Sequence, residues 1–134
     1  LAEILNGHNV PGMLVEAHES TKTIDTVMSV CSWLLEQGAD RDALVLAVGG
    51  GITSDMVGFA ASIYKRGVRF AYIPTTLLSQ VDAAIGGKTG VNFDRYKNIL
   101  GIIRIYMPSD ACESVTTRFP FGSGGDAQDI YHRG

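Results

Sequence analysis

The sequence predicts an α/β domain with a doubly wound, mostly parallel sheet. Apolar runs of strand length alternate with amphipathic stretches of helix length, which is typical of this class. One run, Ala43–Val48, is apolar throughout, as in a central parallel strand. Glycines follow the runs where they end, and ligands of such sheets bind at the carboxyl ends of the strands. We therefore expect a functional site at those ends.

The first half of the chain predicts two strands and a helix. Met13–Val15 is a short apolar run after Pro11-Gly12 and is read as a strand. Ala43–Val48 is expected to be a strand covered on both faces. The helix between them ends at Gly38 as a C-cap, and its apolar stripe recurs at steps of three and four: Ile24, Val27, Met28, Cys31, Leu34 and Leu35.

The glycines at 49–51 break this strand, and a second helix is expected to begin near Thr53–Asp55 and to stop before Gly67. A strand over Val68–Ile73 should end at Pro74–Thr76. A third helix, from about Leu77 to Ile85, should lead into a glycine loop over 86–90. The inward residues of the second helix are predicted to be Met56, Phe59, Ala60 and Ile63.

Composition and charge narrow the class of protein. With 46% hydrophobic and 19% charged residues over 134 positions, the chain is one globular domain or part of a larger protein. The net charge of −3 argues against nucleic acid, and no apolar run reaches the roughly 18–20 residues that a membrane span needs. Cys31 and Cys112 match no metal spacing and indicate reduced thiols of an intracellular protein. Because the chain starts at Leu1, we expect an excerpt or a processed start.

Glycine and positive charge are unevenly distributed. Nine of the sixteen glycines fall between Gly49 and Gly101, where backbone would have to turn or approach a ligand closely. Residues 1–67 carry 4 Lys/Arg and 8 Asp/Glu, whereas residues 68–134 carry 7 and 6. An anionic ligand is therefore expected on the second half. Residues 105–134 lack sustained periodicity, and Gly122–Gly125 is typical of a linker.

The segment from Gly49 to Asp55 is a candidate phosphate site. A glycine turn between a buried strand and a helix lets backbone N–H groups approach a pyrophosphate. The dinucleotide fingerprint is incomplete, because Ser54 stands where its third glycine belongs. Alternatively, Thr53 and Ser54 are helix caps and Asp55 neutralises the helix dipole.

A second candidate is the lysine-bearing glycine loop at 86–90. Gly87-Lys88-Thr89 fails the phosphate-loop test, because Asp82 occupies the position of the first glycine. What remains is Lys88 followed by further cationic and amide side chains that favour a phosphate or carboxylate: Arg95, Lys97 and Asn98. The alternative is a solvated loop.

Asp82 and the histidines complete the candidates. Asp82 is a carboxylate in an otherwise apolar segment, so it is either functional or a helix residue facing water. The histidines are too scattered for a metal site: His8, His18 and His132.

Together these motifs resemble the NAD-binding half of 3-dehydroquinate synthase, a sugar phosphate cyclase, over about Val15 to Arg104. The segments that carry the resemblance are Gly49-Gly-Gly-Ile-Thr-Ser-Asp55, Tyr64-Lys-Arg-Gly-Val-Arg-Phe70, Pro74-Thr-Thr-Leu-Leu78, Gln80-Val-Asp82, Gly86-Gly-Lys-Thr-Gly-Val-Asn92 and Lys97-Asn98. The resemblance implies a Rossmann-like domain over residues 1–104, a divergent or truncated tail over 105–134, and no C-terminal helical metal-binding domain.

The resemblance also implies an activity. The family converts 3-deoxy-D-arabino-heptulosonate 7-phosphate into 3-dehydroquinate and phosphate, in the shikimate route to chorismate and the aromatic amino acids. A hydride passes from a ring alcohol to NAD, phosphate is eliminated, the hydride returns, and an aldol step closes the carbocycle. A divalent metal, zinc or cobalt, polarises the alcohol. The complete enzyme is expected to be a cytoplasmic homodimer, and this chain alone is expected to be inactive.

Site residues follow from the same resemblance, position by position. The residues that it places on NAD are Glu19, Lys22, Gly50, Gly51, Ile52, Thr53, Ser54, Asp55, Thr75, Thr76, Lys88 and Lys97. Those that it places on substrate are Asp82, Lys88, Asn98 and Arg66, with Asp82 and Lys88 catalytic and Arg66 reaching a neighbouring subunit.

The chain departs from the family at the metal. The family's ligands are one glutamate and two histidines, none of which can be placed here. The segment most similar to the family's glutamate segment is Ala127–Tyr131. In it, Gln128 occupies the position of the glutamate and is a poor zinc ligand, and Tyr131 occupies the position of a lysine. Two alternatives therefore stay open: another NAD-dependent sugar phosphate cyclase, and a non-catalytic nucleotide-binding module.

Overall fold

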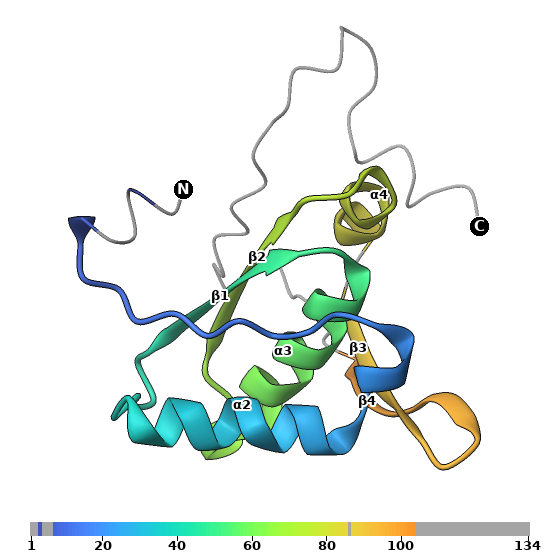
Figure 1. The fold of residues 1–134 in the computed structure, drawn as a ribbon, viewed down its shortest axis with the longest axis horizontal. Helices are drawn as coiled ribbons and strands as arrows, with labels where there is room; N and C mark the ends of the chain where they lie inside the picture. The colour runs from blue at the N-terminus through green and yellow to red at the C-terminus, as the bar shows by residue number, and fades with distance from the viewer. Residues whose placement is uncertain (1–2, 4–6, 86, 104–134) are drawn as a thin grey trace, which may run out of the picture.

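The computed structural model describes residues 3, 7–85 and 87–103 (Figure 1). It has an α/β fold with a parallel sheet, as predicted. In chain order the elements are η1 (Glu19–Thr21), α2 (Ile24–Glu36), β1 (Leu44–Gly49), α3 (Gly51–Ile63), η2 (Tyr64–Arg66), β2 (Arg69–Pro74), α4 (Leu77–Ile85), β3 (Lys88–Phe93) and β4 (Tyr96–Ile103). The predicted linker, Cys112 and the Ala127–Tyr131 segment lie outside the described residues.

Two strand pairs make up the sheets. β1 and β2 pair in parallel from Leu44↔Arg69 to Gly49↔Pro74, and α3 is the crossover between them. β3 and β4 form a separate antiparallel hairpin. The glycine loop predicted over 86–90 is therefore wrong beyond Gly87, because β3 begins at Lys88.

Glycines hid this hairpin from the sequence pattern. A Cβ added to Gly101 would lie 2.0 Å from the backbone oxygen of Thr89, so the two strands approach each other where side chains are missing. Glycine weakens the apolar pattern of a strand but permits such close contact. The same residues that suggested a loop are thus paired strand residues.

Helix α2 has the predicted bounds but a rotated apolar stripe. Thr23 caps its start by accepting from the Thr26 N–H at 3.4 Å. Gly38 follows its end with a φ of +69°, the left-handed conformation expected of a glycine C-cap. Its buried residues are Val27, Val30, Cys31 and Leu34. Met28 and Leu35, predicted inward, are 51% and 62% exposed because Val30 takes the inward position.

Helix α3 is the centre of the core. It contacts α2, β1, β2 and β3, and Figure 1 shows it between α2 and the strands. Met56, Phe59 and Ala60 are buried as predicted, whereas Ile63 is exposed at the last turn. The helix begins at Gly51 rather than near Thr53, because Gly50 is its N-cap.

One face of β1 is not covered by the described part of the chain. Leu44, Leu46 and Val48 are exposed there, whereas Ala47 is buried. The prediction that this strand is covered on both faces is thus wrong for the described residues, because α3 packs on one side only. Met13–Val15 also forms no strand, although Val15 packs against the core.

In the described residues no helix is long and apolar enough to cross a bilayer. Cys31 is a free, buried thiol on α2. Burial raises its pKa. This thiol therefore belongs to the core.

Candidate functional site

The carboxyl end of β1 forms a tight glycine turn into α3. Gly50 is the N-cap of α3, and no side chain caps this end. A Cβ on Gly49 would lie 2.6 Å from Thr53 Oγ1, whereas one on Gly51 would meet nothing within 4 Å. The first N–H groups of a helix lack intrahelical partners, and the helix dipole favours negative charge beside them. This turn is suited to an anion.

The residues after the turn form the first turn of α3. The Ser54 N–H donates to the Gly50 carbonyl at 3.1 Å, and Thr53 is buried under the turn. Since Gly50 occupies the N-cap, Thr53 and Ser54 are not helix caps and that alternative is wrong. Ile52 is partly buried against the core.

The end of β2 lies beside the same turn. The Thr75 N–H donates to the Gly49 carbonyl at 2.8 Å, and a Cβ on Gly50 would lie 3.5 Å from Thr76 Cγ2. Thr76 also caps α4, because its Oγ1 accepts from the Ser79 N–H at 3.2 Å. The structure thus brings the predicted pair Thr75 and Thr76 to the predicted glycines.

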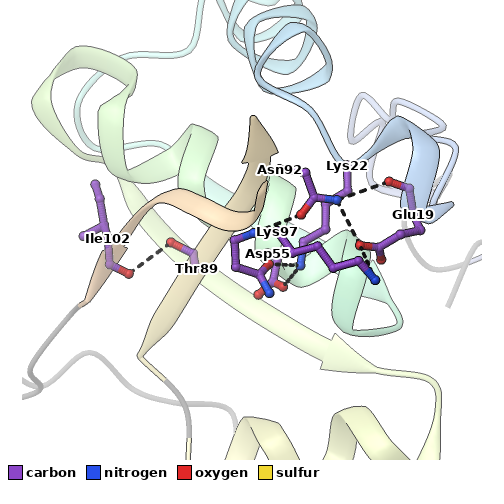
Figure 2. Close-up of polar contacts among 8 residues, drawn as sticks. Glu19, Lys22, Asp55, Thr89, Asn92, Lys97 and Ile102 are labelled. Atoms are coloured by element: carbon purple, nitrogen blue, oxygen red, sulfur yellow. Dashed lines mark hydrogen bonds and ion pairs between the residues drawn. The ribbon is translucent and has the colours of Figure 1, made fainter. Parts of the chain in front are cut away.

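Lys22 is a buried ammonium that joins three segments (Figure 2). Its residue exposure is only 5%. Lys22 Nζ lies 2.5 Å from Asp55 Oδ2 on α3 and donates to Asn98 Oδ1 on β4 at 2.6 Å. A buried charge needs such partners, since an unpaired one would be strongly destabilising. Lys22 therefore fixes Asp55 and Asn98 relative to each other.

A more exposed network continues from this cluster. Lys97 Nζ lies 3.9 Å from Glu19 Oε1, and the two side chains are 75% and 52% exposed. Asn92 Nδ2 donates to the same Glu19 oxygen at 2.9 Å. Exposed ion pairs contribute little to stability. Glu19 and Lys97 are thus available to a ligand at small cost.

A groove opens on the Asp55 side of the cluster. Its polar lining includes Asp55, Lys88 and Asn98, from α3, β3 and β4 respectively. The rest of its wall is the hairpin: Thr89, Gly90, Ile99, Gly101, Ile102 and Ile103. The groove therefore combines a cation, a carboxylate and an amide with apolar walls.

Two predicted residues stand apart from this network. Asp82 is exposed on α4. Arg66 lies in η2, beyond the opposite end of α3 from the glycine turn, in a hollow that it shares with Asp40, Arg41, Asp42 and Lys65. In the described part of the chain, neither makes a polar contact with the Lys22 cluster.

Tyr72 and Asn92 are site residues that the sequence did not single out. The Tyr72 hydroxyl donates to the Gly49 carbonyl at 2.9 Å and so braces the turn. Burial raises the pKa of Tyr72; the carboxylates of Asp55 and Asp82 act in the same direction, while a hydrogen bond with Ser79 lowers it. The only signal in the sequence was a tyrosine two residues before Pro74, within a strand.

Metal ligands are the remaining question. Residues 3, 7–85 and 87–103 contain no group of three or more histidine, cysteine, aspartate or glutamate side chains placed to hold an ion. The ligand set of a catalytic metal therefore does not fit on the described residues.

A helix N-terminus at the carboxyl end of a parallel strand, beside a groove with a lysine, is the arrangement of nucleotide-binding α/β domains. Comparison of the sequence with protein families identifies the family to which this domain belongs. The family model described as 3-dehydroquinate synthase N-terminal matches residues 12–116. The chain belongs to the 3-dehydroquinate synthase family.

Curated relatives that match most of this chain are named 3-dehydroquinate synthase. The chain is 42% identical over 122 residues to 3-dehydroquinate synthase of Alkaliphilus oremlandii. This match covers 88% of the chain and 34% of the relative. The chain is 47% identical over 115 residues to 3-dehydroquinate synthase of Buchnera aphidicola, covering 86% of the chain and 31% of the relative. The chain thus spans about a third of the length of the curated relatives it matches.

Solved structures place the fold among sugar phosphate cyclases. A 2-epi-5-epi-valiolone synthase from Streptomyces hygroscopicus with NAD+ and Zn2+ bound matches with a TM-score of 0.69 and 48% identity, over 76% of this chain and 29% of that one. A 2-deoxy-scyllo-inosose synthase complexed with carbaglucose-6-phosphate, NAD+ and Co2+ matches with a TM-score of 0.68 and 33% identity, over the same shares.

Proposed function

We propose that this chain is the NAD-binding domain of a 3-dehydroquinate synthase, which converts 3-deoxy-D-arabino-heptulosonate 7-phosphate to 3-dehydroquinate and phosphate. The observation that carries the proposal is the contact of the buried Lys22 ammonium with Asp55 and Asn98, because Asp55 follows the glycine turn on α3 and both side chains line the Lys88 groove. One set of contacts thus connects a place for a dinucleotide with a place for an anionic substrate. The family membership supports this reaction.

The glycine turn fits NAD. Backbone N–H groups at the start of α3 would bind the pyrophosphate, because Gly50 and Gly51 leave that end uncovered by side chains. Thr75 and Thr76 adjoin the turn, and Asp55 lies one helical turn further on. Glu19 and Lys97 are the exposed groups that we assign to the rest of the cofactor. When bound, NAD supplies reversible removal of hydride from a ring alcohol.

The groove fits a phosphorylated sugar. Lys88 is an exposed cation at the start of β3 and would pair with substrate phosphate or carboxylate. Asn98 and Asp82 would orient hydroxyl groups, with Asp82 as the exposed carboxylate on α4. Arg66, at the far end of α3, is assigned to a neighbouring subunit's site in a homodimer. The apolar wall of Ile99 and Ile102 would limit the access of water.

The metal belongs to a part of the enzyme that the described residues do not supply. We propose zinc or cobalt as the metal of the complete enzyme, in agreement with the ions in the two solved cyclases. The complete enzyme is expected to act in the cytoplasm, within the shikimate route.

A second candidate function is another cyclase of the same family. The identity to the valiolone synthase, 48%, is as high as the identities to the two named 3-dehydroquinate synthases, 42% and 47%. The sequence identity of this domain to its relatives therefore favours neither product. Both candidates need the same NAD site and differ in the substrate.

The test separates binding from product. The purified chain is titrated with NAD by calorimetry, with Gly51→Val as the matched variant that blocks the turn. Then residues 12–103 replace the corresponding part of the Alkaliphilus relative, and this chimaera is assayed for phosphate release from the heptulosonate phosphate and from a heptulose phosphate without the carboxylate. Release only from the first supports 3-dehydroquinate synthase. Release only from the second favours the alternative, and undetectable NAD binding contradicts both.

A further inference from the structure

The hairpin carries a bulge beside the site. β3 and β4 pair regularly from Lys88↔Ile103 to Val91↔Leu100, but the next pair is Phe93↔Tyr96. Residue 92 of β3 is thus opposed by residues 97–99 of β4. Bulges near functional sites aim side chains in directions that a regular ladder would forbid. Here the bulge contains both Lys97 and Asn98.

Asn92 is held from the side opposite the bulge. Its backbone N–H donates to the Lys22 carbonyl at 2.9 Å, and Thr23 and Asn92 form an isolated parallel bridge. The backbone of Asn92 is therefore fixed to the segment that carries Glu19 and Lys22. The contact of Asn92 with the bulge of β4 is therefore made by its side chain.

The side chain of Asn92 uses both ends of its amide (Figure 2). Its Oδ1 accepts from the Asn98 N–H at 3.0 Å, and its Nδ2 donates to Glu19 Oε1 at 2.9 Å. One partner can only donate and the other, a carboxylate, can only accept, so the amide has one orientation. Asn98 itself has a φ of +52°, a left-handed conformation that asparagine tolerates.

We propose that Asn92 is a positioning residue that fixes Lys97 and Asn98 against Glu19, Lys22 and Asp55. This inference rests on the proposed function, because it concerns how the cofactor and substrate groups are held. With Asn98 N–H anchored, its Oδ1 meets the Lys22 ammonium at 2.6 Å. With Glu19 anchored, Lys97 Nζ lies 3.9 Å from the same carboxylate. One amide therefore sets the spacing of both contacts.

The first measurement follows the backbone and does not need a ligand. Amide hydrogen exchange of Asn98 is recorded by NMR in the 134-residue chain, in Asn92→Ala and in Asn92→Asp. Asn92→Ala removes the acceptor, so exchange at Asn98 should be at least about tenfold faster. Asn92→Asp keeps an acceptor, so exchange there should stay near that of the unmodified chain. Equal exchange at Asn98 in all three chains overturns the proposal.

The second measurement follows NAD affinity by calorimetry. Asn92→Asp places a carboxylate against Glu19, so affinity should fall at least about tenfold. The double variant Glu19→Gln with Asn92→Asp restores a donor–acceptor pair in the reverse direction and keeps the net charge. Because Glu19 is itself assigned to the cofactor, the double variant is compared with Glu19→Gln alone, and the two affinities should differ by less than about tenfold.

Val30→Ala is the control for a merely structural role, because Val30 is buried on α2 and not in the polar network. An Asn92→Asp affinity no lower than that of Val30→Ala, or a double variant that binds NAD more than about tenfold more weakly than Glu19→Gln alone, overturns the proposal. If the unmodified chain binds no NAD, the proposed function fails while the exchange measurement still decides the role of Asn92.

Discussion

Replacing Lys22 with methionine tests whether the contacts of this buried ammonium hold the domain together. Methionine keeps an unbranched apolar stem, so the change removes the ammonium and leaves most of the packing. Asp55 and Asn98 would each lose a hydrogen-bond donor, at 2.5 and 2.6 Å. The domain should therefore lose stability through unpaired polar groups rather than through a cavity.

The expected loss follows from the burial of the two charges. Breaking a fully buried pair costs about 3–5 kcal/mol. The Lys22 side chain is 7% exposed but that of Asp55 is 30% exposed, so water can solvate part of the orphaned carboxylate. We therefore expect a loss of about 2–3 kcal/mol. With a urea dependence of about 1–3 kcal/mol per molar, the midpoint should fall by about 0.7–3 M.

Lys97→Met is the matched control, because that ammonium is 75% exposed and 3.9 Å from its partner. Its unfolding free energy should change by less than about 0.5 kcal/mol. The assay is urea unfolding followed by tryptophan fluorescence from Trp33, the single tryptophan. A double change of Lys22→Met with Asp55→Leu should cost less than the sum of the single changes. Equal midpoints for Lys22→Met and Lys97→Met would refute the reasoning.

Three further outcomes are expected. Gly51→Val should lower NAD affinity more than tenfold, about 1.4 kcal/mol, with stability nearly unchanged, because its side chain enters open space in the unliganded chain; calorimetry with Gly51→Ala as the smaller step checks this. Burial raises the pKa values of Cys31 and Tyr72, so the folded state holds these protons more tightly and stability should fall as pH rises above their ordinary values. The urea midpoints of Cys31→Ala and Tyr72→Phe should decline less steeply over that pH range than the midpoint of the unmodified chain. A reagent that reacts with thiolates should label Cys31 faster in urea than in buffer at pH 8. The chain alone, given NAD and zinc, should release no phosphate over repeated turnovers, since its described residues offer no metal ligand set; steady release measured with a phosphate sensor would contradict this.

Local patterns predicted the elements that local chemistry determines. The step of three and four residues placed α2, and the glycine after it marked its end. The continuous apolar run placed β1, although not its exposed face, because coverage depends on elements distant in the sequence. The hairpin was missed because Gly90 and Gly101 remove the side chains by which a strand is recognised.

The site was predicted as a set of residues but not as an arrangement. Lys22, Asp55 and Asn98 were each assigned by resemblance, yet only the tertiary structure places one ammonium on both side chains. Asn92 carried no signal beyond its place at the end of a glycine motif, because its role comes from a register shift between strands. Spacing along the chain does not encode such a shift.

The Lys22 cluster also has a consequence for the order in which the domain folds. Its two contacts close loops of 33 and 76 residues, so neither forms from local structure. Contacts of such long range slow folding, because chain entropy is lost before they are gained. During synthesis, Asp55 is available to Lys22 well before Asn98 has been translated. The Lys22 ammonium would then have only one of its two hydrogen-bond partners until β4 has been synthesised. Completion of the cluster is thus expected to be a late step of folding, after the rest of the core has formed.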